Sequence, residues 1–492
     1  MLRSPRFLAA LVGLLVLSGC GTTNVNYVTG ENQRGAYTWA QEVQIGREAD
    51  QQIVAQYGVY DDAAVTAYVN RVAQSVLETS AYNDPSTPAE VRNTPFTFRV
   101  LDSPVVNAFA LPGGFVYVTR GLMSYLENEA QLAVVLGHEV GHVLARHSSE
   151  RAARQQLGQL GLLGAAVLGT AVGGGRVGQG ILDYGGTGAQ LLFLRYGRDA
   201  EREADQAGVA YAEFAGYDAS TAATFFVSLE RLSSASGGSL PGFLSTHPDP
   251  SERAQTIPQL AAQYDSGTET DRAGYLAAID NMVLGEDPRQ GYVENNTFYH
   301  PELRFRFDTP SGWQVQNGAQ AVVIAAPNNA GAIQFTLASQ SSASAAAQAL
   351  RSQQGVSVSS QRSTNVNGHP AVELSGTAAQ QSGALGFKAL FIEQGGRVYQ
   401  FLGIAPANGL NAVSAQFDRT FRSFATLTDA RYLNRQPTRL DVVTASGSRS
   451  FASYLSGRPT PPGMTEEELA IMNEVRLTDV IPSGTPLKLP AN

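Results

Sequence analysis

Cysteine is almost absent from this chain of 492 residues: Cys20 is the single one, so no intramolecular disulfide can form. Lysine is nearly as scarce, with only Lys388 and Lys488, and arginine therefore supplies nearly all of the positive charge. Charged residues make up 16% of the chain, and the formal net charge is -9. Because no basic stripe stands out, the composition argues against a nucleic-acid partner. A chain of this length exceeds one ordinary core and predicts two or three domains.

The first twenty residues have the pattern of a bacterial lipoprotein signal peptide. Arg3 and Arg6 give the start a positive charge, and residues 7–17 form an apolar run that is short for a transmembrane helix. The four residues that end at Cys20 resemble a lipobox, whose cysteine is lipidated and becomes the mature N-terminus. A glycine follows, which favours the periplasmic side of the outer membrane. We therefore expect a lipid anchor on Cys20, although a plain signal peptide with an incidental cysteine fits the same residues. Residues 21–35 are polar and rich in asparagine, which predicts a flexible tether.

The segment His138-Glu139-Val140-Gly141-His142 carries the strongest chemical signal in the chain. It lies in a stretch with helical periodicity, so the two histidines, four residues apart, share one face and can bind one ion. Neutral imidazole suits zinc. Glu139 is placed to act as general base on a metal-bound water rather than as a ligand. The segment therefore predicts one zinc ion per chain.

Two imidazoles leave a catalytic zinc site incomplete, because such a site takes a third protein ligand and keeps one position for water. The extended motif with a third histidine is excluded, since Ala145 and Ser148 occupy the positions of its glycine and histidine. His147 follows His142 by five residues, about 140° further round a helix. We therefore interpret His147 as a surface or packing histidine that points elsewhere.

The acidic stretch of residues 198–205 offers a better third ligand. It predicts a second helix, on which Glu201 and Asp205 share a face. Glu201 can bind the metal, and Asp205 can accept a hydrogen bond from the outer nitrogen of a ligand histidine and fix its orientation. Glu203 should point away into solvent. An acidic helix alone is usually only a solvated surface, so this interpretation depends on the histidine motif before it.

The order of these two motifs, about sixty residues apart, resembles the HtpX/BepA-like, CAAX-prenyl-protease type of zinc metallopeptidase. Residues 105–118 are similar to the stretch before that family's metal-binding helix, and residues 127–133 are similar to the start of the helix. Residues 246–253, with the sequence THPDPSER, are similar to a later His-Pro segment. The resemblance covers residues 40–255. It departs at Gly197, where the family usually has serine.

The resemblance implies a set of site residues. The implied zinc ligands are His138, His142 and Glu201, with Glu139 as the base. His247 would reach the site, either to stabilise the oxyanion or to occupy the metal in a resting form; a surface histidine before a proline turn is the alternative. Arg198, Arg253 and Asp205 would support the ligands from behind. The implied fold is α+β, with a mainly helical, gluzincin-like zincin domain that contains a small sheet.

Alternating residues from Gly114 to Arg120 predict a strand before the metal-binding helix. An extended peptide could add to its edge through main-chain hydrogen bonds, which would give broad sequence tolerance. The expected substrate strand comprises Asn107, Gly114, Phe115, Val116 and Tyr117. An ordinary core strand fits the same pattern.

Residues 157–180 are apolar and rich in glycine, and they approach the length of a membrane span. Glycines and Arg176 interrupt the run. We interpret it as a hairpin or cover between the two ligand helices rather than a true span.

We expect the peptidase domain to comprise residues 36–285. After it, the residue pattern of the chain changes twice. Residues 292–430 predict a small α+β accessory domain with an antiparallel sheet and no catalytic cluster. Residues 438–492 are similar to the second half of a LysM module, with a short helix, an asparagine, a Pro-x-Gly turn and a closing strand. The strands expected in the accessory domain are residues 303–307, 321–325, 333–338, 371–374, 387–393 and 398–404, and the helices are 344–353 and 410–421.

These patterns together predict a zinc endopeptidase that hydrolyses internal peptide bonds of unfolded or misassembled envelope proteins. Its expected role is protein quality control in the periplasm. Two alternatives stay open. A latent protease could act mainly as a chaperone or assembly factor. The LysM-like tail suggests instead an enzyme that cuts peptidoglycan stem peptides, with peptidoglycan as a partner.

Overall fold

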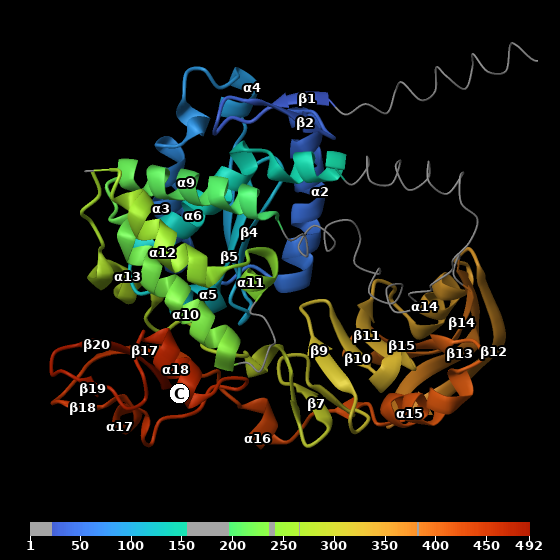
Figure 1. The fold of residues 1–492 in the computed structure, drawn as a ribbon. Helices are drawn as coiled ribbons and strands as arrows, with labels where there is room; N and C mark the ends of the chain where they lie inside the picture. The colour runs from blue at the N-terminus through green and yellow to red at the C-terminus, as the bar shows by residue number, and fades with distance from the viewer. Residues whose placement is uncertain (1–21, 155–195, 236–241, 265, 381–382) are drawn as a thin grey trace, which may run out of the picture.

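The computed structural model describes residues 22–154, 196–235, 242–264, 266–380 and 383–492. The predicted signal peptide with Cys20, and the glycine-rich stretch 157–180, lie outside the described residues. Figure 1 shows a helical part that is coloured blue to green, a sheet domain that is coloured yellow to orange, and a red C-terminal part beneath the helical one. In the part of the chain that is described, no helix is long and apolar enough to cross a membrane.

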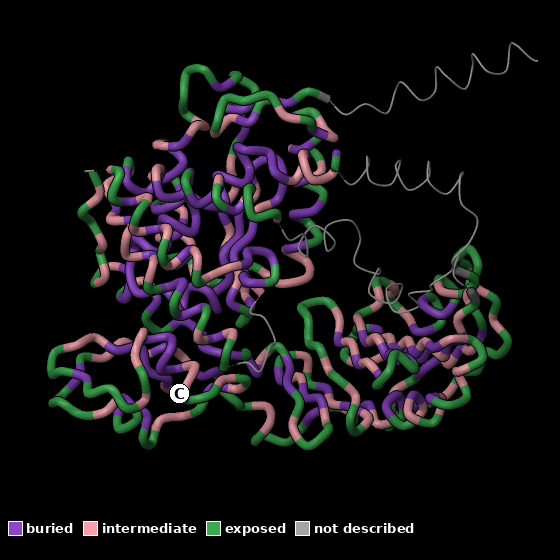
Figure 2. Tube along the Cα trace, viewed as in Figure 1, coloured by how far each residue is buried: buried purple, intermediate pink, exposed green. Residues whose placement is uncertain are grey.

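The helical part surrounds one central helix, α6, and a small sheet. All sixteen residues of α6 are buried, so it is covered on every side. The Asn128 side chain caps its start by accepting a hydrogen bond from the Gln131 amide. The elements of this part are α2 (Trp39–Tyr57), α3 (Ala63–Glu78), α4 (Ala89–Arg92), β3 (Thr97–Leu101), β4 (Ala108–Leu111), β5 (Phe115–Thr119), α5 (Arg120–Tyr125), α6 (Glu129–Leu144), α9 (Arg198–Phe214), α10 (Ala222–Ala235), α11 (Gly242–Thr246), α12 (Pro250–Ala261) and α13 (Arg272–Ile279). Figure 2 shows buried chain running through the centre of this part.

The small sheet has the strand order β3-β5-β4, and this corrects the expected substrate strand. β5 carries the residues that were expected at an edge, but it pairs with β3 on one side and with β4 on the other. Val116 and Tyr117 are fully buried as a result. Alternation along a strand does not reveal its place in a sheet, because strand order is set by residues far away in sequence. The edge beside α6 is β4, which follows Asn107.

Residues 22–35 form a hairpin and not the flexible tether that their composition predicted. β1 (Thr22–Val25) pairs with β2 (Asn32–Gly35). The Tyr27 amide donates to the Leu144 carbonyl at 3.0 Å, and the Gln33 side chain donates to the Ala145 carbonyl at 2.6 Å. Carbonyls at a helix C-terminus have no partner inside the helix. The hairpin supplies partners for the carbonyls of Leu144 and Ala145 and so caps the end of α6.

The sheet domain holds a seven-stranded sheet in the order β12-β13-β14-β15-β11-β10-β9, with every pair antiparallel. This agrees with the predicted antiparallel α+β domain. Side chains of β15 alternate between two cores: Tyr399 and Phe401 pack with α15, and Val398 packs with α14. The strands are β9 (Gln314–Asn317), β10 (Ala321–Ala325), β11 (Ala332–Ala338), β12 (Val356–Val366), β13 (His369–Gln380), β14 (Gly383–Gln394) and β15 (Arg397–Pro406), and the helices are α14 (Ala343–Arg351) and α15 (Leu410–Arg422).

A second, four-stranded sheet in this domain has the order β16-β8-β7-β6, so the first predicted strand belongs to it and not to the main sheet. Its strands are β6 (Tyr292–Glu294), β7 (Thr297–His300), β8 (Phe305–Asp308) and β16 (Ala425–Thr426), followed by α16 (Ala430–Leu433).

The C-terminal part packs against the helical part. β17 (Arg439–Thr444) pairs with β20 (Pro486–Ala491), and α17 (Phe451–Leu455), α18 (Glu466–Met472) and the short strands β18 (Arg449–Ser450) and β19 (Val480–Ile481) lie between them in sequence. Its apolar side chains join the same hydrophobic cluster as those of α6. The C-terminal residues therefore share a core with the helical part.

Candidate metal centre

The helix α6 places His138 and His142 on one face, with their Nε2 atoms 3.0 Å apart. Both side chains are about 1% exposed. Burial holds the pKa of each imidazole well below its ordinary value, so both rings are neutral. Neutral imidazole is the form that binds a metal ion.

The helix α9 approaches α6 closely because both helices carry glycine where they cross. A Cβ atom on Gly208 would lie 2.7 Å from the His138 backbone nitrogen, and one on Gly137 would lie 2.9 Å from the Gly208 carbonyl oxygen. The short distance between the helix axes lets a glutamate side chain from α9 reach the histidines. Glu201 Oε1 lies 3.5 Å from His142 Nε2, and Glu201 Oε2 lies 3.7 Å from His138 Nε2.

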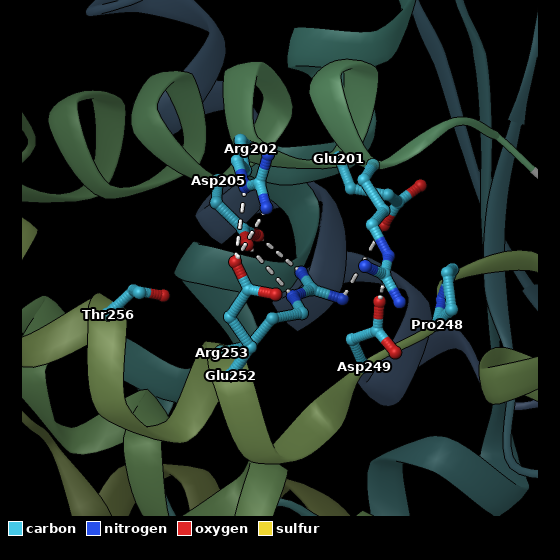
Figure 3. Close-up of a pocket in the computed structure, with 9 residues that line it drawn as sticks. Glu201, Arg202, Asp205, Pro248, Asp249, Glu252, Arg253 and Thr256 are labelled. Carbon is cyan, nitrogen blue, oxygen red and sulfur yellow. Dashed lines mark hydrogen bonds and ion pairs between the residues drawn. The ribbon is translucent and has the colours of Figure 1, made fainter.

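Asp205, one turn after Glu201, holds His138 from behind. Its Oδ1 atom lies 2.9 Å from His138 Nδ1, as the spacing of the acidic helix suggested. Arg253 from α12 donates to both oxygens of the same carboxylate. Burial raises the pKa of Asp205, and the guanidinium of Arg253 opposes that rise. Figure 3 shows Asp205 and Arg253 facing one another across the gap between their helices.

His247 lies within the same cluster. Its Nδ1 atom is 3.1 Å from both Glu201 oxygens and 3.2 Å from His138 Nε2. Its Nε2 atom is 3.3 Å from Glu139 Oε1. Burial would lower the pKa of His247, but the carboxylates of Glu201 and Glu139 raise it above its ordinary value. The surface position that was the alternative for this histidine is wrong.

These four side chains form a donor set that fits a metal ion. One ligand atom each from His138, His142, Glu201 and His247 lies within 4.8 Å of all the others, and all four residues are buried. Asp205 accepts the proton on Nδ1 of His138, which leaves a lone pair on Nε2 facing the other imidazole. Lone pairs that face one another at 3.0 Å repel unless a cation lies between them. The chemistry of the set, nitrogen and carboxylate oxygen, suits a transition metal.

Glu139 occupies the position of a proton acceptor beside this set. It is fully buried, and within the described part of the chain neither carboxylate oxygen has a hydrogen-bond partner. Burial raises the pKa of Glu139 to about 7, and the charge of His247 works against that rise. The pKa of Glu201 moves the other way: burial would raise it, but His247 and His142 together hold it well below its ordinary value. The raised pKa of Glu139 suits a general base, and the lowered pKa of Glu201 suits a metal ligand.

Arg198 does not support the ligands as expected. Its side chain is 69% exposed and pairs with Asp249 at 2.9 Å, at the rim of a pocket that also borders Glu201 and Arg253. Of the expected edge-strand residues, Asn107 lies beside Gly242, the first residue of α11. Gly114, Phe115, Val116 and Tyr117 belong to β5 and its preceding turn, away from the edge.

The sequence did not reveal three side chains that lie around the ligands, those of His147, Glu203 and Tyr196. His147 is 3% exposed, and its Nδ1 atom lies 2.8 Å from Nδ1 of His142. Glu203 was expected in solvent, but its side chain is only 25% exposed and contacts His147 and Asn26. The Tyr196 ring stacks on His142 with ring centroids 4.1 Å apart, and its hydroxyl lies 3.0 Å from Ser148 Oγ. No local motif marks Tyr196, whereas the His147 position is visible as a histidine close to the motif.

Comparison with known proteins supports this geometry. The fission yeast Schizosaccharomyces pombe has a mitochondrial metalloendopeptidase OMA1 that is 29% identical over 256 residues, which is 50% of this chain and 70% of that protein. The beta-barrel assembly-enhancing protease of Escherichia coli K12 is 30% identical over 219 residues, 43% of this chain and 42% of its own length. A putative beta-barrel assembly-enhancing protease of Vibrio cholerae is 31% identical over 210 residues, 42% of this chain and 41% of its own.

The chain thus spans less than half the length of these two bacterial relatives. A solved structure of the cyanobacterial PsbP protein from Synechocystis covers 26% of this chain at 14% identity, with a TM-score of 0.23. The resemblance that the two motifs indicated is confirmed by the family comparison. Residues 66–261, which contain all the donors of the cluster, match the model of Peptidase family M48.

Proposed function

We propose that the protein is a zinc-dependent endopeptidase that hydrolyses internal peptide bonds of proteins. One observation carries the proposal: four buried metal donors converge beside Glu139, a buried glutamate that has no hydrogen-bond partner among the described residues. His138, His142 and Glu201 would hold the zinc ion. When bound there, zinc polarises the scissile carbonyl and makes a nucleophile of water near neutral pH.

The protein's own residues would handle the protons. Glu139 is the base that takes a proton from the attacking water and gives one to the leaving amine. A carboxyl with a pKa of about 7 can do both near neutral pH. His247 points its Nε2 atom toward Glu139 and can donate to the oxygen on which negative charge develops.

The substrate would bind as an extended segment beside β4. Among the described residues this strand pairs on one side only, and its residues Ala110 and Leu111 line a small pocket together with His142 and Tyr196. Main-chain hydrogen bonds to such an edge accept many sequences. They also require an unfolded segment, which suits a protease that acts on misassembled proteins.

His247 supports a resting form of the same enzyme. Its ring contacts Glu201, His138 and Glu139 at once, so it occupies space that a substrate carbonyl would need. Movement of the His247 side chain away from Glu201 and Glu139 would open that space. The residue would thus block the site at rest and stabilise the oxyanion during hydrolysis.

The cellular role that we propose is quality control of envelope proteins. The names of the bacterial relatives, beta-barrel assembly-enhancing proteases, support it. The lipobox pattern at Cys20 supports anchoring on the periplasmic side of the outer membrane. The C-terminal part has the LysM-like order of a strand, helices and a closing strand, and we propose that it contacts peptidoglycan.

The test is cleavage of casein by the zinc-loaded protein and its Glu139→Gln variant. Loss of the base should lower kcat/KM by roughly 10²- to 10⁴-fold while zinc content stays the same. Glu230→Gln, at an exposed position of α10, is the matched control and should keep full activity. Undiminished proteolysis in Glu139→Gln would refute the mechanism. Release of muropeptides without cleavage of casein would favour a peptidoglycan stem-peptide endopeptidase instead. In the same series, Glu201→Ala should lose zinc.

A further inference from the structure

The outer ring nitrogens of the two histidine ligands, His138 and His142, have different partners. His138 has Asp205 at its outer nitrogen, 2.9 Å away. His142 has no carboxylate there; its outer Nδ1 atom faces Nδ1 of His147 at 2.8 Å. A metal-binding histidine ordinarily gives its other N–H to a carboxylate, a carbonyl or a water. An imidazole in that position is unusual.

His147 reaches this position because the helix stops just before it. α6 ends at Leu144, and Arg146 adopts a left-handed conformation with φ of 58°. The regular helix is therefore interrupted and the next helical stretch begins at His147, so the angular argument for a continuous helix no longer holds. Arg146 is costly in this conformation. Its side chain compensates by pairing with buried Glu42 at 2.6 Å and by donating to the Tyr37 carbonyl.

The far side of His147 faces a carboxylate. His147 Nε2 lies 3.7 Å from Glu203 Oε2, and the other Glu203 oxygen accepts a hydrogen bond from the Asn26 side chain. Asn26 is buried in the loop that joins β1 to β2. The same side chain accepts bonds from the amides of Val28 and Thr29, which fix its direction. The N-terminal hairpin thus holds Glu203 in place.

Proton positions along this row follow from the metal site. If His142 binds metal through Nε2, its proton is on Nδ1 and must be donated to His147 Nδ1. The proton of neutral His147 is then on Nε2, which points toward the negative charge of Glu203. Every group in the row has a partner of the correct kind.

We propose that His147 and Glu203 are positioning residues for the ligand His142, with Asn26 of the N-terminal hairpin holding Glu203. The row does for His142 what Asp205 does for His138. In this arrangement one helix, α9, serves the metal three times: through Glu201 directly, through Asp205, and through Glu203 by way of His147. The inference rests on the proposed metal site, and it makes residues 22–35 part of that site.

The test measures zinc affinity by competition with a chromophoric chelator, using the full chain at fixed pH. His147→Leu keeps the packing but removes the hydrogen bond with His142 and the contact with Glu203, and it should weaken zinc binding by about 10- to 100-fold. His147→Gln keeps an acceptor toward His142 and a donor toward Glu203, and it should restore most of the affinity. Glu203→Gln and Asn26→Ala should show smaller losses. Asp199→Asn, whose side chain on α9 is fully exposed, is the control and should match the wild type.

The absorption bands of the cobalt-substituted protein give a second readout, because they report the geometry around the ion. They should change in His147→Leu and return toward the wild-type spectrum in His147→Gln. Equal affinities in His147→Leu and the wild type, or equal losses in His147→Leu and His147→Gln, would overturn the inference. Failure of the proposed function would appear in a different place, as absence of zinc binding in the wild type itself.

Discussion

The interiors of the peptidase region and the sheet domain are built from different kinds of side chain. Along α6 the buried residues include charged and polar groups, among them Glu129, Gln131 and Glu139. The core of the sheet domain is aromatic: Phe335 packs on Phe401 with ring centroids 4.5 Å apart, and other phenylalanines surround them. Buried polar groups are costly unless they have partners. In the peptidase region Glu129 is paired with Arg71 and Gln131 with Thr224, whereas Glu139 lies beside the metal donors.

Close packing serves a different purpose in each interior. In the peptidase region, glycines let two helix backbones approach until ligands from both can meet. In the sheet domain, Gly403 of β15 makes room for the Phe417 ring of α15. A methyl group added to either glycine should therefore have different consequences, and this pair provides the sharpest test of the comparison.

Gly208→Ala should have the largest effect. The new Cβ atom would lie 2.7 Å from the His138 backbone nitrogen, and a backbone cannot move aside as a side chain can. The helices must separate, so we expect a loss of stability of about 3 kcal/mol and loss of zinc binding by at least about 100-fold. Zinc competition and urea unfolding measure the two effects.

Gly403→Ala is the matched control in the sheet domain. Its Cβ atom would lie 2.6 Å from Phe417 Cδ2, so this domain should lose stability while zinc affinity stays at the wild-type value. If Gly208→Ala kept its zinc affinity, the approach of the helices would not be what brings Glu201 to the histidines.

Much of the site could be predicted because it lies within two helices. Helical spacing alone puts His138 with His142 and Glu201 with Asp205, so each pair was placed correctly relative to its own helix. The position of His147 could not be predicted, because one left-handed residue, Arg146, interrupts the helix just before it. No residue within five positions of Arg146 predicts its left-handed conformation. The ion pair of Arg146 with Glu42, which is distant in the sequence, stabilises that conformation.

The other predictions were limited because they depend on contacts between residues that are far apart in the sequence. Alternation predicted β5 but not its place between β3 and β4, which depends on strands that precede it. The composition of residues 21–35 is equally compatible with a tether and with a hairpin whose side chains bond to α6. In the sheet domain six strands were predicted, but β12 (Val356–Val366) was missed, because most of its side chains are polar and exposed and show little alternation with apolar residues.

The two lysines of the chain offer a second contrast. Lys488 is fully buried, and its ammonium group donates to the carbonyls of Ser124 and Leu126, just before α6 begins. Lys388 in the sheet domain pairs with Asp418, a partly exposed carboxylate. Lys488→Met should cost about 2 kcal/mol, because two buried carbonyls lose their donor and buried Glu127, 3.0 Å from the ammonium group, loses one of its ion pairs. Lys388→Met should cost less than about 1 kcal/mol, as surface pairs usually do.

The two tryptophans let each domain report separately. Trp39 lies in the peptidase region and Trp313 in the sheet domain. Fluorescence during urea unfolding, in a Trp313→Phe background for Lys488 and a Trp39→Phe background for Lys388, gives the two free energies. Equal losses would mean that the C-terminal part does not stabilise the peptidase region through Lys488.

The last expected effect is a pH dependence confined to the sheet domain. Burial lowers the pKa of His300 to about 4, and Nδ1 of this ring accepts a hydrogen bond from the Leu303 amide. The unfolded chain binds a proton near pH 6.5, so the contribution of His300 to stability is complete above that pH. It falls between pH 6.5 and 4 and changes no further below. Because the ring is partly exposed, we expect a loss of about 1 to 2 kcal/mol over this range. Trp313 fluorescence in the Trp39→Phe background measures it. His300→Asn should abolish this dependence; if the slope persisted in that variant, a different group would be responsible for it.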